Sequence, residues 1–364
     1  MSDDGSNGAP SGDLLDRVAS LGTLWAAARR AARGKRDRMS VARCLFNLET
    51  VVVRLHTTLL DGRWQPGRPG RHVVHDPKTR EIVAAPFEDR IVHQALCEHI
   101  GPLLERHLIP RTYACRFGLG THAAIRQAVV WSRAYRFALH LDVRKFFPSI
   151  DHAILLAQLD HDIRNPRVVD LCRKIVDAGS GHIDAVRQHF PGDELFTPWQ
   201  RGVGLPIGNL TSQHFANRYL SPVDHRATDR LRVHAYLRYM DDMLLFSDDR
   251  AQLSGWGDAI EQACWRQRLR LHPWQVMPTR QGITWLGFRI LPDQVRVKRT
   301  SVVRAKKRLA HLLAEACADP PRWERFMASL RSTFAHWAHG DTWRLRDQTL
   351  RELGLLSDDD LPDG

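Results

Sequence analysis

Two adjacent carboxylates are the residues of this chain most suited to chemistry. Asp241 and Asp242 belong to the run Tyr239-Met240-Asp241-Asp242, which lies between the apolar segments AYL and MLLF. Two strands that meet here form a hairpin with both carboxylates near its tip. Adjacent carboxylates repel each other, and burying them without partners is costly. A cation that prefers hard oxygen ligands, usually Mg²⁺, removes this cost. The alternative is an acidic turn exposed to solvent.

A third carboxylate, Asp142, ends the strand-like run Leu139-His140-Leu141 roughly 100 residues earlier. If the strand that carries Asp142 lies beside the hairpin, three carboxylates surround two metal ions. Two metals about 4 Å apart stabilise both the attacking and the leaving oxygen in phosphoryl transfer. The three residues therefore predict a two-metal site for that reaction. The alternative role of Asp142 is to cap the end of a strand.

The charge balance indicates a polyanionic partner. The chain has 53 Lys and Arg against 41 Asp and Glu, a net charge of +12. Residues 1–13 carry three Asp and residues 357–364 carry four, with no base in either stretch, so the middle of the chain has a charge of about +19. Such a basic body is typical of nucleic-acid-binding proteins. A highly charged, solvated surface is the alternative explanation.

Composition excludes several classes of protein. Hydrophobic residues make up 43% of the chain and charged residues 26%, which is ordinary for a globular protein. No apolar run approaches the roughly 18 to 20 residues that span a membrane, so we expect no membrane partner. The acidic start is not a secretory signal. None of the six cysteines has zinc-site spacing, and we expect reduced thiols in the cytoplasm.

The intervening residues predict the elements that position these carboxylates. A basic stretch, Arg29 to Arg38, links the first two expected helices, and residues 179–201 form a connection punctuated by Gly and Pro. Helical patterns cover residues 14–32, 40–60, 88–108, 152–178 and 302–316. Strand-like runs lie within residues 63–87, 138–142, 234–249 and 283–298.

These motifs, taken in order, resemble a known family. Asp142-x4-Phe147, the segment LPIGNLTSQ and the YMDD run are similar to the palm of a prokaryotic reverse transcriptase, an RNA-directed DNA polymerase. The likeness covers roughly residues 40–350. It includes segments that resemble the family's fingers and thumb: PKTREIVAAPFEDRIVHQAL, YACRFGLGTHAAIRQA, ITWLGFRI and SLRSTFAHWAHGDTWRLR.

The resemblance implies an α/β (α+β) fold: a right-hand polymerase with fingers, an antiparallel-sheet palm and a helical thumb. The expected parts are an N-terminal tail and helix (1–37), fingers (38–135), a palm (136–292, with a helical connection at about 152–201), a thumb (293–352) and an acidic tail (353–364).

The resemblance also implies roles for individual residues. Asp142, Asp241 and Asp242 are the expected catalytic residues and ligands of two Mg²⁺ ions, for which Mn²⁺ is a substitute. Phe147 matches the aromatic residue under the incoming sugar, where a ring excludes a 2′-hydroxyl; its alternative is a core position, which we expect for Phe146. The other expected substrate-binding residues are Lys78 and Arg80 (triphosphate oxygens), Ile207, Gly208 (close backbone approach) and Gln213. For Lys78 and Arg80 the alternative is a solvated hairpin.

One position departs from the family pattern. Most members have a Lys at about Trp274-Gln275, where it protonates the pyrophosphate leaving group. This chain has none there, and His272 is the candidate replacement.

The loop sequence narrows the resemblance. Ile207-Gly208 and Ser212-Gln213 stand where most members carry Gln-Gly and Ser-Pro, and this resembles the reverse transcriptases of diversity-generating retroelements. That subtype implies error-prone copying of a template RNA, with a cDNA primer strand, dNTPs and a small basic accessory protein as partners. Two alternatives stay open: an antiviral defence-associated reverse transcriptase and a non-catalytic RNA-binding scaffold.

Overall fold

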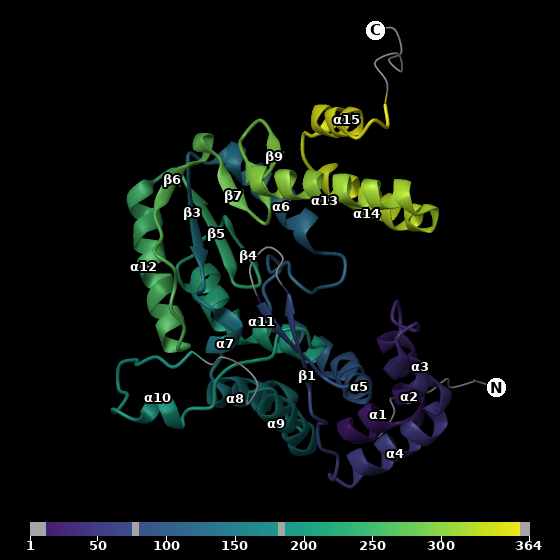
Figure 1. Cartoon of the computed structure of the whole chain (residues 1–364). Coiled ribbons are helices and arrows are strands. Elements are labelled where there is room, and N and C mark those ends of the chain that lie inside the picture. The colour runs from purple at the N-terminus through teal and green to yellow at the C-terminus, as the bar shows by residue number, and fades with distance from the viewer. Residues whose placement is uncertain (1–11, 75–79, 181–185, 357–364) are drawn as a thin grey trace, which may run out of the picture. The chain divides into compact units, whose positions relative to one another are not determined.

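Figure 1 shows the computed structural model of the chain, which describes residues 12–74, 80–180 and 186–356. Within these ranges no helix is both long and apolar enough to cross a bilayer. The chain forms two compact units, each assembled from separate stretches of sequence. Unit 1 contains the described residues up to Cys115 together with Asp142–Arg232 and Asp258–His272. Unit 2 contains Arg116–Leu141, Val233–Gly257 and the described residues from Pro273 onward.

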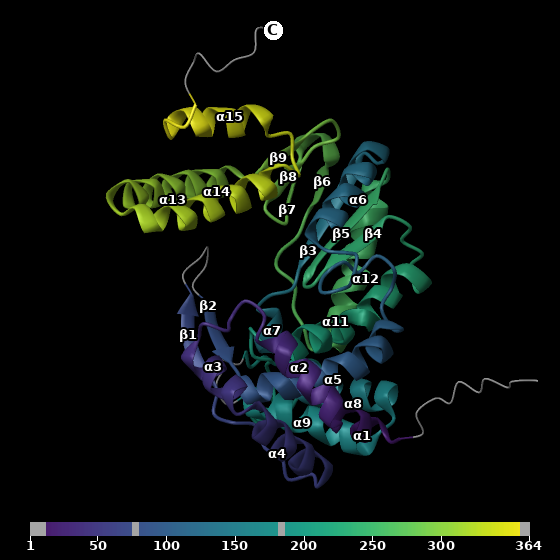
Figure 2. The same cartoon turned by 90° about the vertical axis from the view of Figure 1, so that its right-hand side faces the viewer.

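Four short helices open unit 1, and the first three of them pack against the 19-residue helix α5 (Phe87–Glu105). They are α1 (Leu14–Ala19), α2 (Leu21–Ala31), α3 (Met39–Phe46) and α4 (Leu48–Leu60). Helix α2 lies along α5 (Figure 2), and its buried face is formed by Leu24, Ala27 and Ala28. Small side chains on α2 let the two helix backbones approach closely, which explains why an alanine-rich stretch packs there.

Three of the expected helices are wrong in their extent, because polar residues interrupt each one. The expected helix 152–178 is broken between Ile163 and Pro166, where Arg164 has a left-handed backbone (φ +51°). Ser20 has an extended backbone (ψ 144°), and its Oγ accepts a hydrogen bond from Thr23 N at 3.2 Å. It therefore ends α1 and caps α2 within the expected helix 14–32. Asn47 separates α3 from α4 within the expected helix 40–60, and its Nδ2 donates to Arg43 O at 3.3 Å. Short polar side chains compete with the helical backbone for such bonds.

The rest of unit 1 is one β-hairpin and a group of helices. Strands β1 (Gly70–Val74) and β2 (Arg80–Ala84) pair antiparallel. The helices are α7 (Phe146–Ser149), α8 (His152–Ile163), α9 (Pro166–Ser180), α10 (Thr197–Gln200) and α11 (Leu210–His225), the last continued by a π-helical turn (Arg226–Arg230). Helix α11 packs against α5 and α8 and is buried along most of its length.

Unit 2 is built on a four-stranded sheet with the order β4-β5-β3-β6. Its strands are β3 (Phe137–Asp142), β4 (Tyr236–Tyr239), β5 (Asp242–Ser247) and β6 (Val276–Pro278). The pairs β4–β5 and β3–β6 are antiparallel. Helix α6 (Thr121–Ala134) packs on the sheet, with the Trp131 and Phe246 ring centroids 5.9 Å apart. Strand β3 and helix α12 (Arg250–Arg266) each continue into unit 1.

A second sheet and a helical region complete unit 2. The sheet has the order β7-β8-β9, with antiparallel pairs. The elements after β6 are a 3₁₀ turn (Thr279–Gln281), β7 (Ile283–Trp285), β8 (Phe288–Ile290), β9 (Val295–Val297), α13 (Arg299–Ala318), a second 3₁₀ turn (Pro320–Arg322), α14 (Trp323–Trp337) and α15 (Trp343–Glu352). Leu309, Leu312 and Ala316 of α13 pack against Phe326 and Leu330 of α14. Mixed helices and antiparallel sheets confirm the predicted α+β class, whereas the boundaries of fingers, palm and thumb stay predictions.

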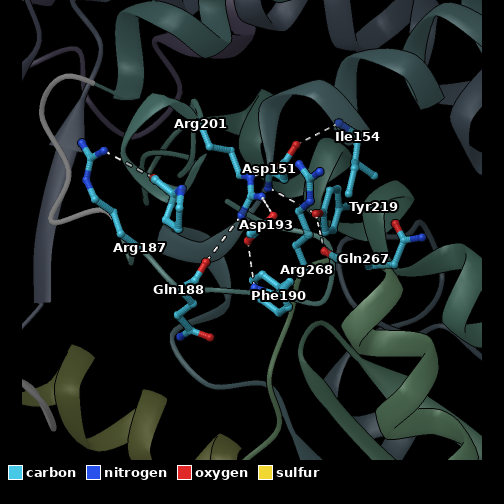
Figure 3. A network of polar contacts seen from close by, with 11 residues as sticks. Asp151, Ile154, Arg187, Gln188, Phe190, Asp193, Arg201, Tyr219, Gln267 and Arg268 are labelled. Carbon is cyan, nitrogen blue, oxygen red and sulfur yellow. Dashed lines mark hydrogen bonds and ion pairs between the residues drawn. The ribbon is translucent and has the colours of Figure 1, made fainter. Parts of the chain in front are cut away.

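A buried ion-pair network in unit 1 secures the connection between α9 and α11 (Figure 3). The Asp151 carboxylate, which is fully buried, lies 3.2 Å from Arg201 Nε and 2.6 Å from Arg268 Nη1. Arg201 also forms an ion pair with Asp193, and the Tyr219 hydroxyl accepts a hydrogen bond from Asp151 N at 3.2 Å. One carboxylate thus ties α8 to the segment before α11 and to the end of α12.

We predict that Asp151→Asn lowers the free energy of unfolding by about 3 kcal/mol, because two buried arginines lose their common counter-charge. Urea denaturation measures the loss. The control is Asp160→Asn on the exposed side of α8, which should change stability by no more than about 0.5 kcal/mol. Equal effects of the two substitutions would contradict the anchoring role of Asp151.

Candidate active site

The YMDD run forms the predicted hairpin. Tyr239 pairs with Asp242, so Met240 and Asp241 alone make the turn between β4 and β5. Met240 has φ +56°, a left-handed conformation that costs a non-glycine residue roughly 1–2 kcal/mol. The fully buried Arg238 donates from Nη1 to Met240 O at 2.7 Å. A charge-assisted hydrogen bond thus holds the strained turn that presents both carboxylates.

Two further side chains contact this turn. Thr121 Oγ1 at the start of α6 donates to the Tyr239 hydroxyl at 3.0 Å. His140 Nε2 on β3 lies 2.9 Å from Asp242 Oδ1, and both side chains are partly exposed. Polar contacts from α6 and β3 therefore fix the motif from outside it.

Asp142 ends β3, as the sequence predicted, whereas its role as a metal ligand stays a prediction. Strand β3 is the neighbour of β5, and the His140–Asp242 contact shows that the last residues of β3 meet the first residues of β5. Asp142 ends β3 two positions after His140, so the two side chains leave the same face of the strand. Its carbonyl oxygen accepts a hydrogen bond from His272 N at 2.8 Å.

The donor set suits a hard cation, because all three candidates are carboxylates. Among the described residues, however, no three Asp, Glu, His or Cys side chains are grouped closely enough to hold an ion. Magnesium is usually bound by one or two carboxylates together with substrate phosphates. The roles of Asp142, Asp241 and Asp242 as metal ligands therefore stay predictions.

In unit 1, the segment Gly204–Asn209 is fixed on two sides. Leu205 N donates to Phe147 O at 2.8 Å, which joins the segment to α7. On the other side, Val83 N of β2 donates to Ile207 O at 3.2 Å, and Ala85 N donates to Asn209 Oδ1 at 3.2 Å. The carbonyl of Ile207 is therefore held by strand β2.

Gly208 has a structural requirement that the sequence did not reveal. Its φ is +118°, and a Cβ at this position would lie 2.8 Å from Ile82 Cγ2. The absence of a side chain thus lets the segment approach β2. Close approach to a nucleotide, the role expected from the sequence, stays a prediction.

The remaining expected residues differ in exposure. Phe146 is buried, as predicted, whereas the neighbouring Phe147 is only partly buried. Gln213 is exposed on α11, and Ile207 is half-buried. Arg80 lies in β2, but its side chain and the whole of Lys78 fall outside the described residues.

Three contacting residues were missed by sequence reasoning: Thr121, His140 and Arg238. Each had a signal. Arg238 is a charged residue inside an apolar strand, His140 shares a strand face with Asp142, and Thr121 follows the two glycines of the GLGTH run.

The chain is similar to known proteins in sequence. Residues 74–290, more than half of the chain, match the reverse transcriptase (RNA-dependent DNA polymerase) family. An uncharacterized 91 kDa protein in the cob intron of Schizosaccharomyces pombe (strain 972 / ATCC 24843) is 25% identical over 159 residues, which are 43% of this chain and 18% of that protein. This chain thus matches less than a fifth of its curated relative's length.

Two solved structures show a distant likeness. Telomerase from Candida albicans, in complex with a TWJ fragment of telomeric RNA, has a TM-score of 0.46 at 12% identity, covering 80% of this chain and 55% of that one. Apo telomerase from Candida tropicalis, truncated from its C-terminal domain, has a TM-score of 0.47 at 10% identity, covering 66% and 58% of the two chains.

We predict that Gly208→Ala lowers the free energy of unfolding by about 1–3 kcal/mol, because the substitution adds backbone strain and a contact with Ile82. Thermal unfolding measures the change. The control is Gly255→Ala within α12, where a Cβ meets no atom within 4 Å and where alanine should stabilise the helix by up to about 1 kcal/mol. If Gly208→Ala is as stable as the unaltered protein, the segment does not dock on β2 as described.

Proposed function

Because the chain belongs to the reverse transcriptase family, we propose that it is an RNA-directed DNA polymerase that joins dNTPs to a cDNA primer on a template RNA. Its α+β fold with antiparallel sheets is in accord with the right-hand polymerase architecture. The observation that carries the proposal is the hairpin Tyr239–Asp242, beside a strand that ends at Asp142.

The carboxylates have the central role in this proposal. Asp142, Asp241 and Asp242 hold two divalent cations, Mg²⁺ or its substitute Mn²⁺. When bound, such ions stabilise the charge that develops on the attacking and leaving oxygens. The strained turn, held by Arg238, keeps Asp241 and Asp242 in a fixed relation, so little reorganisation is required when a nucleotide arrives.

The neighbouring residues supply selection and proton transfer. Phe147, partly exposed next to a buried Phe146, excludes nucleotides that carry a 2′-hydroxyl. His272 has an exposed side chain, and its backbone is bonded to the carbonyl of Asp142 at the end of β3. This location supports His272 as the acid that protonates pyrophosphate in place of the missing Lys.

We predict that Asp241→Asn or Asp142→Asn abolishes primer extension while RNA binding survives, because a neutral amide cannot offset the charge of two cations. A template–primer extension assay and an RNA-binding titration measure the two effects. Asp249→Asn, at an exposed site after β5, is the control and should extend normally. Extension near the normal rate by Asp241→Asn would refute the assignment. If the unaltered protein binds RNA and never extends a primer, the chain is a non-catalytic scaffold.

We propose further that the enzyme copies its template with errors, as in a diversity-generating retroelement, with a small basic protein as accessory partner. The support is Ile207, which stands where most members of the family have Gln. An Ile side chain neither donates nor accepts hydrogen bonds, so it applies no geometry-dependent polar check to the incoming base pair. The antiviral defence type is the alternative outcome.

We predict that Ile207→Gln reduces misincorporation roughly five- to a hundredfold at positions where the unaltered enzyme errs, because one polar contact contributes about 1–3 kcal/mol. Sequencing the cDNA made from a defined template measures the error spectrum. Ile207→Val keeps an apolar side chain and should leave the spectrum unchanged. An active Ile207→Gln enzyme with unaltered errors would remove this position from fidelity control.

A further inference from the structure

The most basic stretch of unit 1 lies far in sequence from the carboxylates. Between positions 29 and 43 the chain has seven Lys or Arg and only one acid, Asp37. Arg30 is paired with Glu98, but the other six bases form no ion pair with any acid in the described part of the chain. Burial and then the charge of Arg38 lower the pKa of Arg90. Positive charge is therefore concentrated here without compensation.

Exposed aromatic residues lie beside these bases. Trp25 precedes Arg29 by one helical turn on α2, and Phe46 follows Arg43 by three residues on α3. Residues at these spacings are neighbours on a helix surface. The Phe46 side chain is 90% exposed and Trp25 is 38% exposed. Each helix thus presents an aromatic ring next to an arginine.

The fold does not require these side chains. Helix α2 packs on α5 through Leu24, Ala27 and Ala28, and α3 buries Val41 and Cys44. The aromatic and basic residues lie outside these buried faces, on α2, on α3 and in the turn that links the two helices. Because the apolar face of α2 is already covered, the helix has no continuous apolar stripe free to enter a lipid bilayer.

A cleft adjoins helix α3. Arg43 lines a cleft of about 590 Å³ between α3, α4 and the first turn of α5, together with Ser40 and Asn47. Arg54 at the same cleft is paired with Glu88, so Arg43 contributes an uncompensated charge. The same cleft is also lined by Glu88, Asp89 and several apolar side chains, so Arg43 and not the cleft as a whole suits a phosphate group.

We propose that single-stranded RNA binds at the α2–α3 basic surface, which we define as Trp25, Arg29, Arg33, Arg36, Arg43 and Phe46. Arginines contact the phosphates, and the two rings stack on bases, the combination by which proteins hold single strands without reading their sequence. The choice of RNA over another polyanion rests on the proposed function. The surface holds a segment of RNA by itself, without participation of the carboxylate hairpin.

Salt-dependent binding of an oligouridylate tests the proposal. The full chain is titrated without dNTPs or divalent metal, and anisotropy reports binding between 50 and 200 mM salt. Replacing Arg29, Arg33, Arg36 and Arg43 by Gln should lower the slope of log affinity against log salt by up to about 2.8, since each lost phosphate contact contributes about 0.7 for single strands. Trp25→Ala with Phe46→Ala should weaken binding at least tenfold and leave the slope unchanged.

A matched control removes four charges elsewhere in unit 1. Arg173, Arg230, Arg232 and Arg266 are exposed, and their replacement by Gln gives the same net charge. If the control lowers the salt slope by the same amount, the effect is one of general charge and the proposal is overturned. The proposal is also overturned if the variant that replaces Arg29, Arg33, Arg36 and Arg43 has an unchanged slope. Equal melting temperatures of all variants confirm that folding is intact.

Binding of DNA and of lipid vesicles is compared with binding of RNA. Tighter binding of a DNA oligonucleotide of matched sequence, or of phosphatidylserine vesicles, would overturn the assignment to RNA. Primer extension is measured independently with the unaltered protein. If the unaltered protein never extends a primer but the four-arginine variant binds RNA less tightly, the polymerase proposal fails while the binding surface stands. If the unaltered protein extends a primer and the variant binds RNA normally, only the binding surface is refuted.

Discussion

The hydrogen bond from the buried guanidinium of Arg238 to the carbonyl oxygen of Met240 is the contact on which the proposed site depends most. It stabilises a two-residue turn whose first residue has a left-handed backbone and whose second is a carboxylate followed by another carboxylate. Neither strain nor charge repulsion favours this turn in isolation. The β4–β5 register forms the turn, and Arg238, which directly precedes the motif in the sequence, stabilises it.

Strand β3 carries the third expected carboxylate at its end. Because β3 lies next to β5, Asp142 needs no loop to position it: it leaves the strand on the same face as His140, which contacts Asp242. Side chains carried on strands are held more rigidly than those on loops. Contacts from Thr121 and His140 then orient the motif from two different elements.

In unit 1, too, a small number of polar contacts holds the irregular connections. The Asp151 carboxylate holds two arginines that come from segments far apart in sequence, and it also caps α8 through a hydrogen bond from Ile154 N. The segment Gly204–Asn209 is fixed by backbone bonds to α7 and β2. In both places irregular chain is held by a few buried polar contacts, whereas the arginines of the α2–α3 basic surface form no ion pair with any described residue.

Local patterns of apolar and acidic residues were enough to predict the YMDD hairpin and the strand that ends at Asp142. The mixed α+β class and the burial of Phe146 were expected from the family resemblance. The surroundings of these elements became known only from the packing of the whole chain. The breaks at Ser20 and Asn47 depend on single local hydrogen bonds that periodicity does not detect. The roles of Arg238, Thr121 and Gly208 depend on partners that other segments supply, such as Ile82, which lies more than 100 positions from Gly208. Periodicity records which side of an element is apolar, but the partner of a buried polar group is set by how distant elements pack.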